Sequence, residues 1–108
     1  MTILGVDPGR DKIGWAMVNY NGNLLSSGIC SVSEQELFLT ALTQGPDRWE
    51  RELSPWVTEN VSQPEELSLI AVGNGTGRTE AVKLLERLGA GIVIVDESGT
   101  TLEARELY

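Results

Sequence analysis

Short apolar runs separated by turn residues dominate this 108-residue chain, and they predict a sheet interrupted by helices. Ile3–Val6 is continuously apolar, which favours a strand buried on both faces. Ile13–Tyr20 and Leu24–Cys30 flank Asn21-Gly22-Asn23, and an Asn-Gly between two β-prone runs is typical of a hairpin. The first third of the chain therefore predicts three consecutive antiparallel strands.

The middle of the chain predicts two helices. The first lies between Ser33 and Gln44 and is ended by Gly45-Pro46. The second begins at Asp47, which forms a capping box with Glu50. Its apolar stripe has helical spacing and comprises Trp49, Leu53, Trp56, Val57 and Val61. Pro55 is expected to kink this helix or restart it after Ser54, and the two Trp side chains are expected to pack against the sheet.

The last third predicts a strand, a glycine-rich loop, a helix and a further strand. Leu67–Val72 is the fourth strand, and Gly73–Arg78 is the loop that leads into a helix from about Thr79 to Leu88. Gly89 is expected to stop that helix. Ile92–Val95 is the fifth strand, and a short last helix is expected between Thr100 and Tyr108, where Thr100 and Glu103 form a capping box.

These elements predict an α/β fold in one domain over residues 1–108. The expected sheet is mixed and five-stranded, with strand order 3-2-1-4-5 and helices on both faces. The parallel strands one, four and five end at one edge, where α/β folds usually bind ligands. We expect the first and fifth strands to lie side by side, so that Asp7 faces Asp96 and Glu97. Such acids would repel one another unless Mg²⁺ or Mn²⁺ lies between them.

The residues beside Asp7 and the glycine-rich loop allow two interpretations each. Asp7 precedes Pro8-Gly9 and stands near Arg10 and Lys12; it is either a functional carboxylate or the first residue of an ordinary turn. Gly73–Arg78 joins a strand to a helix N-terminus, which can hold an anion on backbone N–H groups. The same loop also fits a plain β-to-α turn, and it is not a Walker loop because no Gly-Lys-Ser/Thr follows.

Composition excludes several kinds of chemistry. The chain has no His, which excludes a histidine general base and a His-ligated zinc within it. The single Cys30 forms no internal disulfide, which fits a cytoplasmic setting. No apolar run reaches the length of a membrane span, and the N-terminus lacks the layout of a signal peptide. A hydrolase on this chain would rely on carboxylates, hydroxyls and metal ions.

The net charge of −8 argues against binding to nucleic acid, but the charge is unevenly distributed. Residues 34–66 hold eight acids and two bases, so this block carries −6 of the total. We interpret the block as a solvated surface. Arg10, Lys12 and Arg78 all belong to loops at the edge that holds Asp7.

Three segments, DPGRDKIGWA, VGNGTGR and VDESGTTLEARELY, resemble the YqgF/RuvX type of ribonuclease-H-like domain, including the version in Tex proteins and in Holliday-junction-resolvase-like proteins. The resemblance spans nearly the whole chain. It implies a ribonuclease-H-like fold and a two-metal nuclease mechanism on structured nucleic acid, in recombination or rRNA maturation. By position, Asp7 would be the metal ligand of the first strand and Glu97 the second catalytic carboxylate, with Asp96 supporting the site.

The chain departs from that family at two places. Asn74 stands where related resolvases carry an acid. The last metal-binding Asp of the family lies on a helix beyond Tyr108, so we expect either a truncated chain or a catalytically incomplete domain. A missing final helix would leave one sheet face partly bare and would favour a homodimer.

Three hypotheses follow. The first is a Mg²⁺-dependent nuclease in which Asp7 and Glu97 hold the metal, while Arg10, Lys12 and Arg78 contact the phosphates of RNA or branched DNA. The second is a non-catalytic module of the same fold that binds nucleic acid or protein. The third is an actin-like or sugar-kinase-like ATPase, for which the chain is too short to supply the second lobe.

Overall fold

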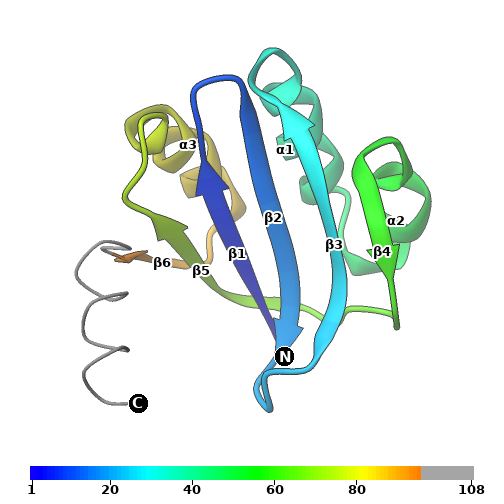
Figure 1. Ribbon diagram of the computed structural model, residues 1–108. Helices are drawn as coiled ribbons and strands as arrows, with labels where there is room; N and C mark the ends of the chain where they lie inside the picture. Colours follow the sequence, from blue (N-terminus) through cyan, green and yellow to red (C-terminus); the bar gives the residue numbers. More distant parts are fainter. Residues whose placement is uncertain (96–108) are drawn as a thin grey trace.

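The computed structural model describes residues 1–95 and has the α/β class that the sequence predicts (Figure 1). These residues form one mixed sheet of six strands, in the order β4-β3-β2-β1-β5-β6. The strands are β1 (Thr2–Pro8), β2 (Lys12–Asn19), β3 (Leu24–Ser31), β4 (Val57–Asn60), β5 (Leu67–Gly73) and β6 (Gly91–Val95). The α-helices are α1 (Gln35–Thr43), α2 (Pro46–Glu52) and α3 (Arg78–Leu85), and short 3₁₀ turns occupy Val32–Glu34, Ser54–Trp56 and Glu86–Leu88.

The antiparallel half of the sheet is built by local turns, as predicted. β1 pairs with β2 and β2 with β3, both antiparallel. Gly22 adopts a φ of 82° in the β2–β3 turn, a conformation that glycine reaches without a steric penalty. The Asn19 side chain accepts hydrogen bonds from the backbone N–H groups of Asn21 and Asn23, each at 3.0 Å. These hydrogen bonds give two backbone N–H groups of the turn an acceptor and fix the register of the hairpin.

The parallel half of the sheet brings three strand ends to one edge. β5 pairs with β1 in parallel, and β6 pairs with β5 in parallel. Their carboxyl ends therefore lie together, beside the β1–β2 turn (Figure 1). β5 lies between β1 and β6, so the expectation that the first and last of the predicted strands are neighbours is wrong.

The core lies between the sheet and the helices. Residues of one strand face are buried, as the twofold repeat of a strand requires, and include Leu4, Val6, Met17, Ile70 and Val72. The helices contribute buried side chains from α1, α2 and α3, namely Phe38, Leu39, Leu42, Trp49, Ala81, Leu84 and Leu85. The predicted packing of the Trp side chains is confirmed, because Trp49 is buried and Trp56 packs edge-on against Phe38, with ring centroids 5.5 Å apart.

The segment after α2 differs from the prediction and adds a strand. The second helix begins at Pro46 and ends at Glu52, and Asp47 lies in its first turn instead of capping it. Pro55 prevents the helix from continuing, and the chain passes through a 3₁₀ turn into β4. β4 pairs antiparallel with the outer side of β3, where β-branched Val57 and Thr58 are favourable. The predicted five-stranded sheet is therefore wrong in strand number, and the order of the whole sheet differs from the predicted 3-2-1-4-5 because β4 is added beside β3.

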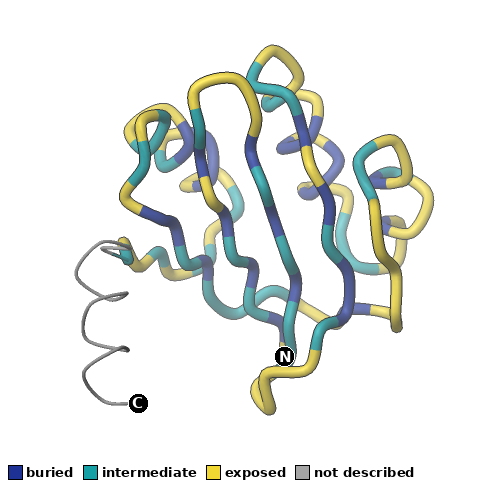
Figure 2. Tube along the Cα trace, viewed as in Figure 1, coloured by how far each residue is buried: buried dark blue, intermediate teal, exposed yellow. Residues whose placement is uncertain are grey.

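The three described helices all cover the same face of the sheet (Figure 1). The opposite face, which we call the open face, is only partly shielded within residues 1–95, as the alternation of buried and half-buried residues along β1 and β2 shows (Figure 2). The predicted last helix lies outside the described residues, so the expectation of helices on both faces stays a prediction. No helix within residues 1–95 is long and apolar enough to cross a membrane.

Candidate functional site at the carboxyl ends of the parallel strands

Asp7 lies near the end of the central strand β1, and its side chain projects from the open face. Leu4 and Val6 point into the core, so the alternation along the strand places Asp7 on the opposite side, where it is exposed. Its neighbour on β2 is Gly14, which has no side chain to cover the carboxylate. The carboxylate is therefore accessible to a ligand that approaches the open face.

A shallow hollow of about 380 Å³ lies beside Asp7. Small residues from three neighbouring strands line it, together with Val95 at the end of β6: they are Gly5, Gly14, Ala16, Ala71 and Gly73. Glycine and alanine recur at alternate positions of β2 and β5, so the sequence already indicates a strip of small residues on each. That the strips flank Gly5 of β1 and form a hollow follows only from the strand order. These residues give the hollow a flat and apolar floor.

The glycine-rich loop packs directly against the turn that follows Asp7. A Cβ atom on Gly75 would overlap the carbonyl oxygen of Pro8, and one on Gly77 would lie 3.1 Å from the carbonyl oxygen of Gly9. Only glycine allows two backbone segments to approach this closely. The loop and the Asp7 turn thus form one continuous rim.

The predicted basic residues lie along this rim. Arg10 lies in the β1–β2 turn and Lys12 begins β2; both are exposed. Arg78 is half-buried and is the first residue of α3. None of the three forms an ion pair within residues 1–95. Their positive charges are therefore available to an anionic ligand at the rim.

Asn74 does not present a free oxygen to a metal. Its side-chain oxygen accepts a hydrogen bond from the Arg78 guanidinium. Its backbone N–H donates to the carbonyl oxygen of Val95 at 2.9 Å, which continues the pairing of β5 and β6. Asn74 therefore orients Arg78 and closes the loop.

The remaining predicted acids, Asp96 and Glu97, lie outside the described residues. β6 ends at Val95, which pairs with Gly73 of β5. Because neighbouring strands are about 4.8 Å apart, the backbones of β1 and β6 are separated by roughly 10 Å. Within residues 1–95, no group of three or more His, Cys, Asp or Glu side chains is arranged to hold a metal.

No known family model matches the sequence, and no curated protein matches it. Among solved structures, the chain is similar to the crystal structure of the Aquifex aeolicus member of the Ppx/GppA protein family, with a TM-score of 0.42 and 11% sequence identity. The similarity covers 88% of this chain and 35% of that chain, so this chain spans about a third of its length.

Proposed function

We propose that this chain is a ribonuclease-H-like domain that binds a divalent cation at Asp7 and hydrolyses phosphodiester bonds in structured nucleic acid. The observation that carries the proposal is the position of Asp7, exposed on the open face at the end of the central strand β1. Strands β1, β2 and β3 in antiparallel succession, followed by parallel β5 and β6, support the ribonuclease-H-like assignment. β4 is an addition at the edge of that arrangement.

The chemistry of Asp7 fits the proposed cation. Mg²⁺ and Mn²⁺ prefer carboxylate oxygens, and Asp7 offers both of its oxygens without an ion-pair partner among the described residues. A single carboxylate binds such ions weakly, so the proposal assigns Glu97 as the second ligand, with Asp96 in support. When bound, the ion would activate water and stabilise the departing 3′ oxygen.

The chain's own cations would orient the substrate. Arg10 and Lys12 lie on one side of the rim, and Arg78 lies across the contact between Gly75 and Pro8. Arg78 is oriented by Asn74, which suits a guanidinium that must meet two phosphate oxygens. Among residues 1–95, the small side chains on the floor of the hollow leave Asp7 open to a nucleic-acid backbone.

Calorimetric titration with Mn²⁺ tests the metal site. The chain should bind Mn²⁺ with a dissociation constant in the millimolar range or tighter, and Asp7→Asn should abolish the binding. Asp11→Asn is the matched control, because Asp11 is also exposed on the β1–β2 turn but does not line the hollow. Equal Mn²⁺ binding by the wild type and Asp7→Asn would contradict the proposal.

Cleavage is tested separately with branched and single-stranded DNA and RNA in the presence of Mn²⁺. Products should appear with the wild type and be absent with Asp7→Asn. Failure to cleave, in a chain extended by a C-terminal helix that supplies a further acid, would contradict the catalytic assignment.

The alternative is a non-catalytic module on the same fold. It is favoured by one observation, namely that Asp7 is the single acid lining the hollow within residues 1–95, with Asn74 engaged by Arg78. A module would bind RNA or DNA equally well in EDTA, whereas the metal-dependent enzyme would lose productive binding. Retention of binding in EDTA, without cleavage in Mn²⁺, would establish the module.

A further inference from the structure

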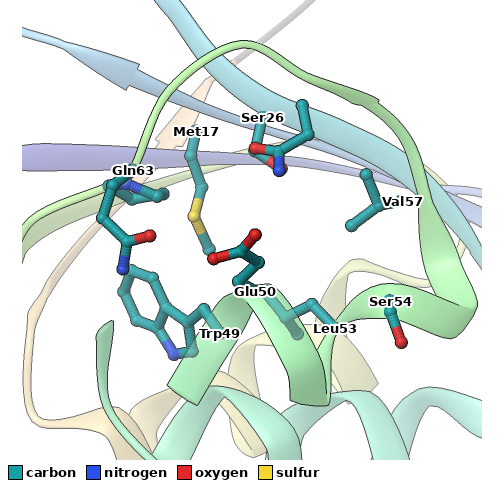
Figure 3. A pocket seen from close by; sticks show the side chains of 10 residues that line it. Met17, Ser26, Trp49, Glu50, Leu53, Ser54, Val57 and Gln63 are labelled. Carbon is teal, nitrogen blue, oxygen red and sulfur yellow. The ribbon is translucent and has the colours of Figure 1, made fainter. Parts of the chain in front are cut away.

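A second hollow lies on the helix side of the sheet, on the face opposite to Asp7 (Figure 3). It has a volume of about 330 Å³ and lies between α2, β4 and the segment that leads into β5. Its apolar lining includes Met17, Trp49 and Leu53, all of which are buried. Val57 of β4, also in the lining, is half-buried and offers apolar surface to an alkyl chain.

Two side chains of the hollow are held in place by their own hydrogen bonds. The Nε2 of Gln63 donates to the carbonyl oxygen of Pro46 at 2.8 Å, which leaves the amide oxygen turned toward the hollow (Figure 3). The Nε1 of Trp49 donates to the carbonyl oxygen of Leu42 at 2.9 Å and fixes the indole ring. The hollow therefore presents an oriented acceptor beside a fixed apolar wall.

A carboxylate provides negative charge in the same hollow. The Glu50 side chain extends from α2 into it, toward Met17 (Figure 3). Glu50 forms no ion pair within residues 1–95, and no Lys or Arg lines the hollow. Ser26 of β3 adds a hydroxyl on the far side and is only 5% exposed. Most of the lining residues belong to the acidic block of residues 34–66, whose net charge of −6 attracts cations.

We propose that this hollow binds a primary alkylammonium group. Acceptors from three different segments line it, namely the Glu50 carboxylate, the Gln63 amide oxygen and the Ser26 hydroxyl. An ammonium group has three N–H donors and no acceptor, so its donors match this set. The attached alkyl chain lies on Val57, a half-buried apolar residue of the lining. The site is independent of the proposed nuclease function.

NMR titration of the full chain with n-butylammonium tests the proposal. The indole N–H signal of Trp49 and the side-chain amide signals of Gln63 should shift and saturate, with a dissociation constant on the order of millimolar, because the carboxylate is partly solvated. The uncharged isostere 1-butanol should produce no saturable shift of these signals. Equal saturation by 1-butanol would overturn the proposal.

Two isosteric variants identify the charge that matters. Glu50→Gln should weaken binding at least tenfold. Glu36→Gln changes the net charge equally but lies on α1 outside the hollow, and it should bind like the wild type. Glu50 is exposed on a helix, so its replacement leaves the fold intact, which the NMR spectrum verifies. Unchanged binding by Glu50→Gln, or an equal loss in Glu36→Gln, would overturn the assignment.

Further ligands separate the sources of the cation. Tighter binding of Nα-acetyl-lysine amide than of n-butylammonium would support a lysine side chain of a partner protein. Tighter binding of n-butylammonium would support a free amine. Tighter binding of n-butylguanidinium than of either would overturn the choice of an ammonium group, because a planar guanidinium places five donors in a fixed fork.

Discussion

Gly75 and Pro8 are in backbone contact: a Cβ atom on Gly75 would overlap the carbonyl oxygen of Pro8. Pro8 directly follows Asp7, and Gly75 lies in the middle of the loop that leads to Arg78. The contact therefore couples the position of the proposed metal ligand to the position of the proposed phosphate-binding residue. Any displacement of one loop has to displace the other.

Replacing Gly75 tests this coupling. Gly75→Ala should lower the free energy of unfolding by about 1–3 kcal/mol, because the added methyl group forces two backbone segments apart. Chemical denaturation measures the loss, and NMR should show shifts at Asp7 and Gly9. The control is Gly91→Ala, whose Cβ would meet only the Leu69 side chain at 3.7 Å. Similar stability of the two variants would contradict the close contact.

Gly28 should be even less tolerant of a side chain. A Cβ atom there would overlap the backbone of Trp56 and lie 2.7 Å from Cζ2 of Trp15. Gly28→Ala should therefore cost about 3 kcal/mol or more and release β4 from the edge of the sheet. Hydrogen exchange of the β4 amides measures the release. Gly5→Ala is the control, because its Cβ would lie 3.8 Å from the nearest atom; protected β4 amides in Gly28→Ala would show the expectation to be wrong.

Cys30 predicts how stability depends on pH in the alkaline range. Burial, with a smaller contribution from the Glu34 charge, raises the pKa of the Cys30 thiol from 9.0 to about 11. The unfolded chain therefore loses this proton at lower pH than the folded chain does. The protonated thiol therefore stabilises the folded state fully below pH 9. This stabilisation, roughly 2–3 kcal/mol of unfolding free energy, is lost as the pH rises toward 11.

Denaturant unfolding of the wild type and of Cys30→Ala at several pH values measures this contribution. The difference in unfolding free energy between the two proteins should be constant below pH 9. Between pH 9 and 11 the wild type should lose stability relative to Cys30→Ala, since all other titrating groups contribute equally to both proteins. The native thiol should also react slowly with a thiol reagent at pH 8, because it is buried and protonated. Rapid modification of the folded chain would contradict this.

Arg78 should contribute to nucleic-acid binding under the proposed function. Arg78→Gln should weaken binding to branched DNA and lower the slope of log K against log salt by about 1, because one phosphate contact is lost. Arg87→Gln is the matched control, since Arg87 lies beyond the opposite end of α3. Binding measured by fluorescence anisotropy at several salt concentrations distinguishes the two; equal slopes for both variants would contradict the role of Arg78.

Elements stabilised by local interactions were predicted well. The Asn21-Gly22 hairpin depends on a turn whose partners lie within four residues, and the 3₁₀ turn that follows α3 ends at Gly89, which adopts a φ of 76°. The helical spacing of Trp49, Leu53 and Trp56 across Pro55 favours a continued helix, whereas the chain forms β4 after Trp56. The pairing of Val57 with Gly28 of β3 makes Val57–Asn60 a strand. Because the two residues are far apart in the sequence, this contact leaves no periodic pattern from which the strand could be predicted.

The sequence by itself determined the α/β class, the position of a carboxylate at the end of β1 and the glycines of the rim, because alternation and turn chemistry act between near neighbours. Only the tertiary structure decided that β4 joins the sheet beside β3, that Asn74 is engaged by Arg78, and that Glu50 and Gln63 line one hollow. These features depend on packing between segments far apart in the chain. Their geometry is fixed by the sheet as a whole, which no local pattern encodes.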